Sequence, residues 1–381
     1  MVTTGGQMKN FKKLFVSLSW MTIFSVALGA AWTTKRLTYN STSSYDPAVA
    51  VNGANVYVVW SDSWNGDIFF KRSADAGATW QASKRLKAND GYSGHPRIAV
   101  NGANIYVTWV DQTSGNDEIY FNRSGDNGAT WQSTKRLTFN SGYSLWPQIA
   151  ISDVNPCVVW QDDTPGDNVI DFRKSLDGGA TWQSARQLTN YPGSSMMPDI
   201  VGDGANLYVV YAGLFSASWE VYFRRSLDGG ATWQSQKRLT YNAGGSSNAK
   251  IAISGANLFV VWEDDTPGNN DIYFKKSTDQ GVTWQTIKNL TNNAGGSYSP
   301  EIAASGSNVY VTWYDDTSGN NEIYVRNSSD GGETWQSSQR LTNDADDSLY
   351  PDIAVSGANV YVAWQDTASG NAEIYVKFSP L

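Results

Sequence analysis

One short segment recurs along this chain at a constant interval. SLDGGATWQS occurs twice in identical form, at residues 175–184 and 226–235, and near copies begin at Ser73, Ser124, Ser277 and Ser328. All six copies fit the pattern S-x-D-x-G-x-T-W, and their tryptophans are spaced by 51 residues. A repeat of fixed period constrains the fold more than the length of 381 residues does. The shared positions of the six copies are Asp75, Asp126, Asp177, Asp228, Asp279 and Asp330, and Trp80, Trp131, Trp182, Trp233, Trp284 and Trp335.

The residues between the copies alternate between apolar and polar side chains. In one repeat, the runs PEIAASG, NVYVTWYDD and EIYVRNS are separated by turn residues, and period-two alternation predicts β-strands. Four short strands in about 50 residues are typical of a β-propeller blade. The first of these strands occurs seven times, so we predict an all-β, seven-bladed propeller of four-stranded antiparallel blades. Its starting positions are Pro47, Pro96, Pro147, Pro198, Ala249, Pro300 and Pro351.

The array has seven first strands but only six copies of the segment, and its two ends explain the difference. The sequence given stops at EIYVKFSPL, where a seventh copy would begin, and WTTKRLT at residues 32–38 matches WQSTKRLT after the second copy. We therefore expect residues 32–38 to form the outermost strand of the last blade. Such closure leaves no sheet edge unpaired between the first and last blades. Residues 32–381 are predicted to be one propeller domain.

The recurring segment itself has the chemistry of a tight turn. Its Asp accepts hydrogen bonds from nearby amides, its Gly supplies a positive φ, and its Trp fills the gap between sheets. The six copies resemble the Asp-box, or BNR repeat, of sialidase-like β-propellers. The resemblance implies the fold more strongly than a function, because similar repeats occur in sialidases, xyloglucan-cleaving glycosidases, sortilin-type receptors and photosystem II assembly factors. Sialidases have six blades, so a seven-bladed chain departs from their pattern.

The first 31 residues have the pattern of an export signal. Lys9, Lys12 and Lys13 precede an apolar run at residues 14–28, and small residues follow at 29–31. We expect a signal peptide at 1–31 and a secreted, cell-surface or periplasmic protein that leaves the membrane after cleavage. An uncleaved membrane anchor is the alternative, because residues 14–31 are nearly long enough to span a bilayer.

Composition excludes several classes of site. The net charge of −8 argues against a nucleic-acid partner. A single cysteine, Cys157, permits no intramolecular disulfide, and a single histidine, His95, excludes metal sites that need several imidazoles. No cofactor is expected, and we expect a monomer. Turn capping is the interpretation we favour for an acidic hairpin that includes Asp162, Asp264 and Asp315, and calcium binding is the alternative.

Candidate ligand-binding residues lie on the rim opposite the recurring turns. Trp64, Trp146 and Trp219 fall outside the repeated tryptophan positions, and exposed aromatic rings can bind the apolar face of a sugar or a partner protein. His95 occupies the position before the proline of its strand. The position after that proline also varies between blades, and its charged occupants include Arg97, Asp199, Glu301 and Asp352.

Two functions fit these residues. The resemblance to sialidases implies a glycoside hydrolase of the exo-alpha-sialidase type, with three arginines, a tyrosine–glutamate nucleophile pair and an aspartate acid/base. Only Arg97 lies on an innermost strand, and the RIP element of that family has no match, so no catalytic residue is predicted. Nearly identical blades favour a carbohydrate-binding or protein-binding module instead, because a catalytic centre needs unlike residues at one place. We therefore predict a binding module for a glycan or an extracellular or cell-surface protein, with the hydrolase as the alternative.

Overall fold

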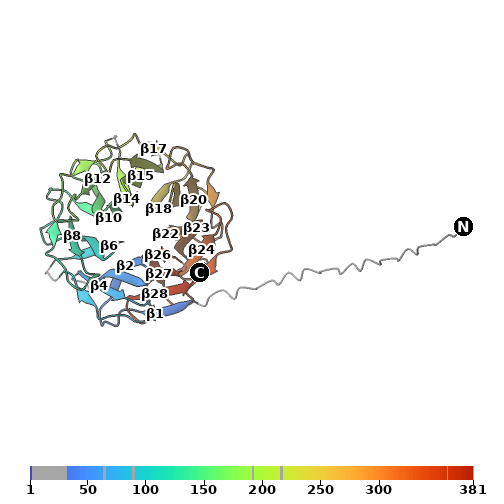
Figure 1. Ribbon diagram of the computed structural model, residues 1–381, viewed down its shortest axis with the longest axis horizontal. Coiled ribbons are helices and arrows are strands. Elements are labelled where there is room, and N and C mark those ends of the chain that lie inside the picture. Colours follow the sequence, from blue (N-terminus) through green and yellow to red (C-terminus); the bar gives the residue numbers. More distant parts are fainter. Residues whose placement is uncertain are drawn as a thin grey trace.

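The computed structural model describes residue 1 and residues 32–62, 66–87, 91–190, 193–214, 218–357 and 359–380. Of residue 380, only the backbone is described. The predicted signal peptide and Trp64 lie outside the described residues. The described residues form 28 strands in seven four-stranded antiparallel sheets, arranged as the blades of a closed ring (Figure 1). The predicted seven-bladed, all-β fold is confirmed. Within the part of the chain that is described, no helix has the length and apolarity needed to cross a membrane.

Each blade runs from an inner strand beside the central channel to an outer strand at the circumference. Blades 1 to 3 consist of β2 (Ser44–Asn52), β3 (Asn55–Asp62), β4 (Asp67–Ser73) and β5 (Lys84–Arg85); β6 (Ser93–Asn101), β7 (Asn104–Asp111), β8 (Glu118–Ser124) and β9 (Lys135–Arg136); and β10 (Ser144–Ser152), β11 (Asn155–Asp162), β12 (Val169–Lys174) and β13 (Arg186–Gln187).

Blades 4 to 7 repeat the same order. They consist of β14 (Ser195–Asp203), β15 (Asn206–Leu214), β16 (Trp219–Ser226) and β17 (Lys237–Arg238); β18 (Ser246–Ser254), β19 (Asn257–Asp264), β20 (Asp271–Ser277) and β21 (Lys288–Asn289); β22 (Ser297–Ser305), β23 (Asn308–Asp315), β24 (Glu322–Ser328) and β25 (Gln339–Arg340); and β26 (Ser348–Ser356), β27 (Asn359–Asp366), β28 (Glu373–Pro380) and β1 (Thr33–Arg36).

The hydrophobic core is divided into layers between neighbouring blades. Between blades 1 and 2, for example, Tyr57 and Val59 of β3 pack with Ile105, Val107 and Trp109 of β7. Each sheet therefore has both faces buried, one against each neighbour. Because every layer needs two blades, the apolar side chains are buried fully only when the ring is complete.

The first and last strands close the ring. β1 pairs antiparallel with β28, from Thr33 opposite Phe378 to Arg36 opposite Tyr375. The Arg36 guanidinium also lies 2.8 Å from a carboxylate oxygen of the buried Glu373. The predicted joining of the two ends is confirmed, because β1 completes the sheet of blade 7 as the outer neighbour of β28.

The recurring turn is held by the same hydrogen bonds in every copy. In blade 4, the Ser226 hydroxyl donates to Asp228 Oδ1 over 2.7 Å and accepts from the Gly230 amide over 2.8 Å. The Thr232 hydroxyl and amide both donate to the Asp228 carboxylate, at 2.5 and 2.7 Å. These bonds from Thr232, with that from Ser226, lower the pKa of Asp228 to about 2. The turn is thus a structural element, as its residues predict.

The turn also locks each blade to the one before it. Gly230 has a φ of +85°, and a Cβ there would lie 2.5 Å from the ring of Phe172 in blade 3. Trp233 meets the same Phe172 ring edge-on, with 5.2 Å between centroids. Glycine is required here both for the positive φ and for the close approach of the neighbouring phenylalanine. The predicted position of the tryptophan between adjacent sheets is what the structure shows.

Candidate functional site

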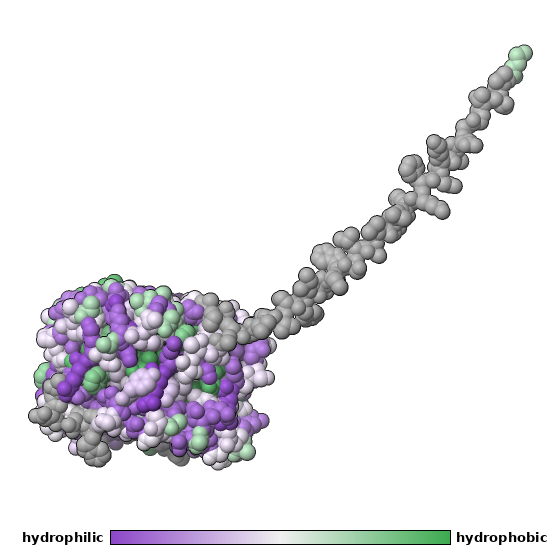
Figure 2. Space-filling view, turned by 90° about the horizontal axis from the view of Figure 1, so that it is seen from below, coloured by the Kyte–Doolittle hydropathy of each residue, from purple (hydrophilic) through white to green (hydrophobic). Residues whose placement is uncertain are grey.

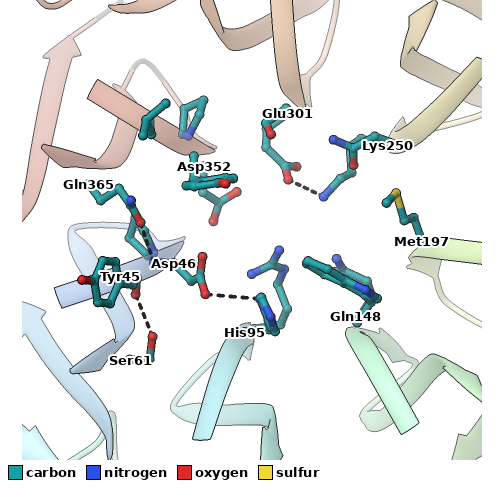
Figure 3. Close-up of a pocket in the computed structure, with 18 of the residues that line it drawn as sticks. Tyr45, Asp46, Ser61, His95, Gln148, Met197, Lys250, Glu301, Asp352 and Gln365 are labelled. Carbon is teal, nitrogen blue, oxygen red and sulfur yellow. Dashed lines mark hydrogen bonds and ion pairs between the residues drawn. The ribbon is translucent and has the colours of Figure 1, made fainter. Parts of the chain in front are cut away.

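A cavity of about 920 Å³ opens at the mouth of the central channel (Figure 3). Strand register places it opposite the recurring turns: Tyr45 and Ser61 of the cavity pair at one end of blade 1, whereas Ser73, which begins a turn, pairs with Val56 at the other. The cavity is formed by the beginnings of all seven inner strands. No single blade could build it alone.

Each inner strand presents its cavity residue through a backbone irregularity. A register shift interrupts the pairing of the first two strands in the blades, and the residue before the proline position has a φ between +49° and +53°. Such φ values are unfavourable for residues other than glycine, and the following proline restricts the residue further. Bulges of this kind redirect side chains. We call these residues the bulge ring, and all of them line the cavity: Asp46, His95, Trp146, Met197, Asn248, Ser299 and Tyr350.

Side chains from preceding blades support the bulge ring. Gln365 of blade 7 accepts a hydrogen bond from the Asp46 amide over 3.2 Å, and Gln161 of blade 3 accepts one from the Met197 amide over 3.2 Å. Glu263 of blade 5 accepts from the Ser299 amide over 2.7 Å. At these three positions, the unusual backbone is therefore held by contacts between blades.

One side of the cavity combines aromatic rings with a charged pair. The rings of His95 and Trp146 lie 4.2 Å apart, centroid to centroid, and are inclined by 39°. His95 Nδ1 lies 3.2 Å from Asp46 Oδ2, which makes an ion pair when the imidazole is protonated (Figure 3). Burial alone would raise the pKa of Asp46, but the hydrogen bond and charge of His95 lower it below its usual value. Two adjoining aromatic rings thus lie beside a carboxylate whose pKa is held low.

Charged groups gather deeper in the channel. The residues after the proline position form a second layer, which we call the channel belt: Ala48, Arg97, Gln148, Asp199, Lys250, Glu301 and Asp352. Most of them surround a smaller chamber of about 150 Å³ below the mouth, and Lys250 forms an ion pair with Glu301 (Figure 3).

Two aspartates of the channel belt are held in an environment that disfavours their charge. Burial, with the charge of Glu301, raises the pKa of Asp352 to about 7, although its carboxylate accepts the Val49 amide over 2.6 Å. Burial likewise raises the pKa of Asp199 to about 6. The belt therefore contains carboxyl groups that exchange protons near neutral pH.

The structure brings most of the sequence-predicted site residues together. His95, Arg97, Trp146, Glu301 and Asp352 line the cavity, and Asp199 lines the chamber below it. Trp219 instead begins β16 and is not among the described residues that line either space. Trp64 lies outside the described residues, so its role stays a prediction.

Sequence reasoning missed several cavity residues. The signal for five of them was available, because Asp46, Met197, Asn248, Ser299 and Tyr350 occupy the same repeat position as His95 and Trp146. Lys250 likewise shares the position of Arg97 and Asp352. A shared position shows equivalence between blades, but only the bulge shows that this position faces the cavity.

The aspartates proposed as calcium ligands have hydrogen-bonding partners. Asp162 accepts bonds from the Ser144 hydroxyl over 2.9 Å, the Trp160 indole over 3.2 Å and the Thr164 amide over 3.0 Å. Asp264 and Asp315 make the equivalent contacts. These are the contacts of turn capping. No cluster of three or more His, Cys, Asp or Glu suited to a metal ion occurs among the described residues, and calcium binding stays an untested alternative.

A comparison with known protein families tests the resemblance to Asp-box propellers that the recurring turns indicate. The model of the BNR repeat-like domain matches residues 151–362, more than half of the chain. This chain belongs to the BNR repeat-like family. The match confirms the resemblance to Asp-box propellers. No curated protein matches the sequence of this BNR repeat-like protein.

Solved structures with the same fold include proteins of several activities. The polysaccharide lyase Uly1 aligns over 91% of this BNR repeat-like protein and 92% of its own chain, with 11% identity and a TM-score of 0.61. The phage phi92 endosialidase aligns over 92% and 69%, with 9% identity and a TM-score of 0.56. The Hadza microbial sialidase Hz136 aligns over 85% and 73%, with 16% identity and a TM-score of 0.54. At these identities the likeness shows the fold alone.

Proposed function

We infer that this protein is an exported carbohydrate-binding propeller that holds a glycan in the cavity at the channel mouth. The observation that carries this inference is that the adjoining His95 and Trp146 rings lie beside the charged channel belt. An aromatic face suits the apolar face of a sugar ring, and carboxylates, amides and cations suit its hydroxyl groups. The cavity is also concave and of ligand size, whereas protein partners usually need a broader surface.

Two further observations support a glycan ligand. The blades repeat one another closely at the recurring turns but differ at the bulge ring, so variation is concentrated where a ligand would bind. The structural neighbours include a polysaccharide lyase, an endosialidase and an alpha-L-arabinofuranosidase, whose names all refer to carbohydrates. Residues 1–31 have the export pattern that an encounter with extracellular glycans requires.

A glycoside hydrolase is the second candidate, favoured by one specific observation. A carboxyl group with a pKa of about 7, such as that of Asp352, is protonated often enough at neutral pH to serve as a general acid. Glu301 supplies a second carboxylate in the same belt, and glycosidases use two. The exo-sialidase arrangement is not favoured, because Arg97 is the one arginine among the described residues that line the cavity.

A glycan array with matched tryptophan variants tests binding. Trp146→Ala removes the stacking surface, so we expect the affinity for the best array ligand to fall by about tenfold or more, on the order of 1.4 kcal/mol. Trp219→Ala is the control, because Trp219 does not line the cavity, and its affinity should be unchanged. Loss of binding in the Trp219 variant but not in the Trp146 variant would move the site away from the cavity.

Hydrolysis assays on the array ligands and on fluorogenic sialosides distinguish the two candidates. Binding without turnover supports the module. Turnover that disappears in Asp352→Asn, with ligand affinity retained, would establish the hydrolase instead.

A further inference from the structure

Three exposed aromatic rings outside the cavity share one local structure. Tyr39, Phe139 and Tyr241 are 72%, 70% and 72% exposed, the largest values for hydrophobic residues inside the described propeller. Each follows an arginine by three positions, and the guanidinium carbon of that arginine lies 4.6–4.8 Å from the ring centroid. One face of each ring is thus covered by the cation, and the other is free.

These rings lie on the same rim as the cavity. Each belongs to a loop that leads from an outer strand to the inner strand of the next blade: β1 to β2, β9 to β10 and β17 to β18. The arginines Arg36, Arg136 and Arg238 are held in the same way in all three loops. Arg36, for example, pairs with the buried Glu373 and donates through Nε to the Thr38 carbonyl over 2.7 Å.

A fourth loop shows that the rings are not needed to hold these arginines. Arg340 pairs with Glu322 and donates to the Thr342 carbonyl over 2.7 Å, as its three counterparts do. The residue at the aromatic position in that loop is the exposed Asn343. Because the support forms equally well beneath an asparagine, packing does not explain the aromatic residues.

The spacing and surroundings of the rings indicate the kind of ligand. They occupy alternate blade junctions, 7/1, 2/3 and 4/5. The circumference of the disc, of which Figure 2 shows one side, is mainly hydrophilic with small separate hydrophobic areas. A stable protein partner usually covers a broad, continuous surface of roughly 800 Å², whereas these rings lie at separate junctions. A polysaccharide is narrow, and single flat rings can stack against its sugars while polar neighbours bind its hydroxyl groups.

We propose that Tyr39, Phe139 and Tyr241 are secondary sugar-stacking sites that hold a polysaccharide across the rim that carries the cavity. The arginine beneath each ring is held by a buried glutamate and restricts the ring, so little side-chain entropy is lost on binding. Several weak contacts on one polymer combine into a higher overall affinity. This inference rests on the proposed function, since the cavity supplies the main contact.

Affinity electrophoresis in gels that contain a soluble polysaccharide tests the inference. The probes are arabinan, alginate, xyloglucan and polysialic acid, and the variants are Tyr39→Ala/Phe139→Ala/Tyr241→Ala and Asn343→Tyr. For a polymer that retards the wild type, we expect the triple variant to lose about tenfold or more in affinity. Asn343→Tyr should add a fourth stacking site and increase retardation. Calorimetry with a disaccharide or trisaccharide of the same polymer should give equal affinities for all forms.

The outcomes separate this inference from the proposed function. Equal retardation of the wild type and the triple variant overturns the secondary sites and leaves the cavity as the glycan site. Binding of oligosaccharides without retardation by any polymer has the same meaning. A wild type that binds neither polymers nor oligosaccharides overturns both. Circular dichroism and unfolding of the triple variant check that it is folded, which is expected because its substituted side chains are exposed.

Discussion

The two rims of this propeller are built from the same seven blades, but one rim repeats the same residues and the other has a different residue in each blade. On the rim of the recurring turns, six copies keep the same serine, aspartate, glycine, threonine and tryptophan, and each copy makes the same hydrogen bonds. On the other rim, the seven members of the bulge ring are all different residues. The first rim is uniform because the turn of each blade packs in the same way against the preceding blade. The second differs from blade to blade although its backbone is equally regular, so its side chains are free to serve a ligand.

The largest effect is expected on the uniform rim. In Gly230→Ala, the new Cβ would collide with the Phe172 ring, and the alanine would have to keep the positive φ of the glycine. We therefore expect a loss of about 2–5 kcal/mol in the free energy of unfolding. Gly255→Ala is the control, because its φ is also positive but nothing lies within 4 Å of its Cβ position. It should cost about 1–2 kcal/mol. Urea unfolding measures both. Equal losses would show that the contact between blades contributes nothing, and glycan affinity of the folded protein should not change in either variant.

A smaller, pH-dependent effect is expected in the channel belt. The pKa of Asp352 is about 7 in the folded protein and 3.8 in the unfolded chain, so the folded state binds the extra proton between these values. Stability therefore falls as the pH rises from about 4 to 7. Asp352→Asn removes the charge, and we expect it to be more stable than the wild type by about 1–3 kcal/mol at pH 8, a difference that disappears near pH 4.

Urea unfolding at several pH values provides the test for Asp352. Asp203→Asn serves as the control. Asp203 is an exposed aspartate at the last position of β14, the end of that inner strand away from the cavity. A stability profile that is the same in the wild type and Asp352→Asn would show that Asp352 ionises normally in the channel.

The smallest effect concerns the backbone of the bulge ring. Met197→Gly and Met197→Ala both remove the side chain from the cavity, but only glycine accepts a φ of +51° without strain. We expect the glycine variant to be about 1 kcal/mol more stable than the alanine variant, as measured by thermal unfolding. An alanine variant of equal or greater stability would mean that the bulge is unstrained, and that its regularity needs another explanation.

The fold could be predicted almost completely because its determinants are local and repeated. The alternation of apolar residues gives the strands, the spacing of Trp80 and its five equivalents gives the blades, and the match between residues 32–38 and later repeats gives the closure. The site could be predicted only in part. His95 and Trp146 were recognisable as departures from the repeat, whereas Met197 and Ser299 look like ordinary variation at an extended position. Trp219 departs just as clearly from the repeat, yet it lies outside the cavity.

By itself, the sequence determined how many blades form, how the ring closes and which turn fastens each blade to the one before it. These features depend on neighbours in the chain and on contacts that recur from blade to blade, so the set of repeats and the two ends of the array reveal them. The tertiary structure decided which of the varying residues meet. Seven side chains far apart in sequence converge on one cavity because the inner strands of all seven blades begin around the channel mouth, and in three blades a glutamine or glutamate of another blade holds the left-handed backbone in place. That contact exists only after the blades have assembled.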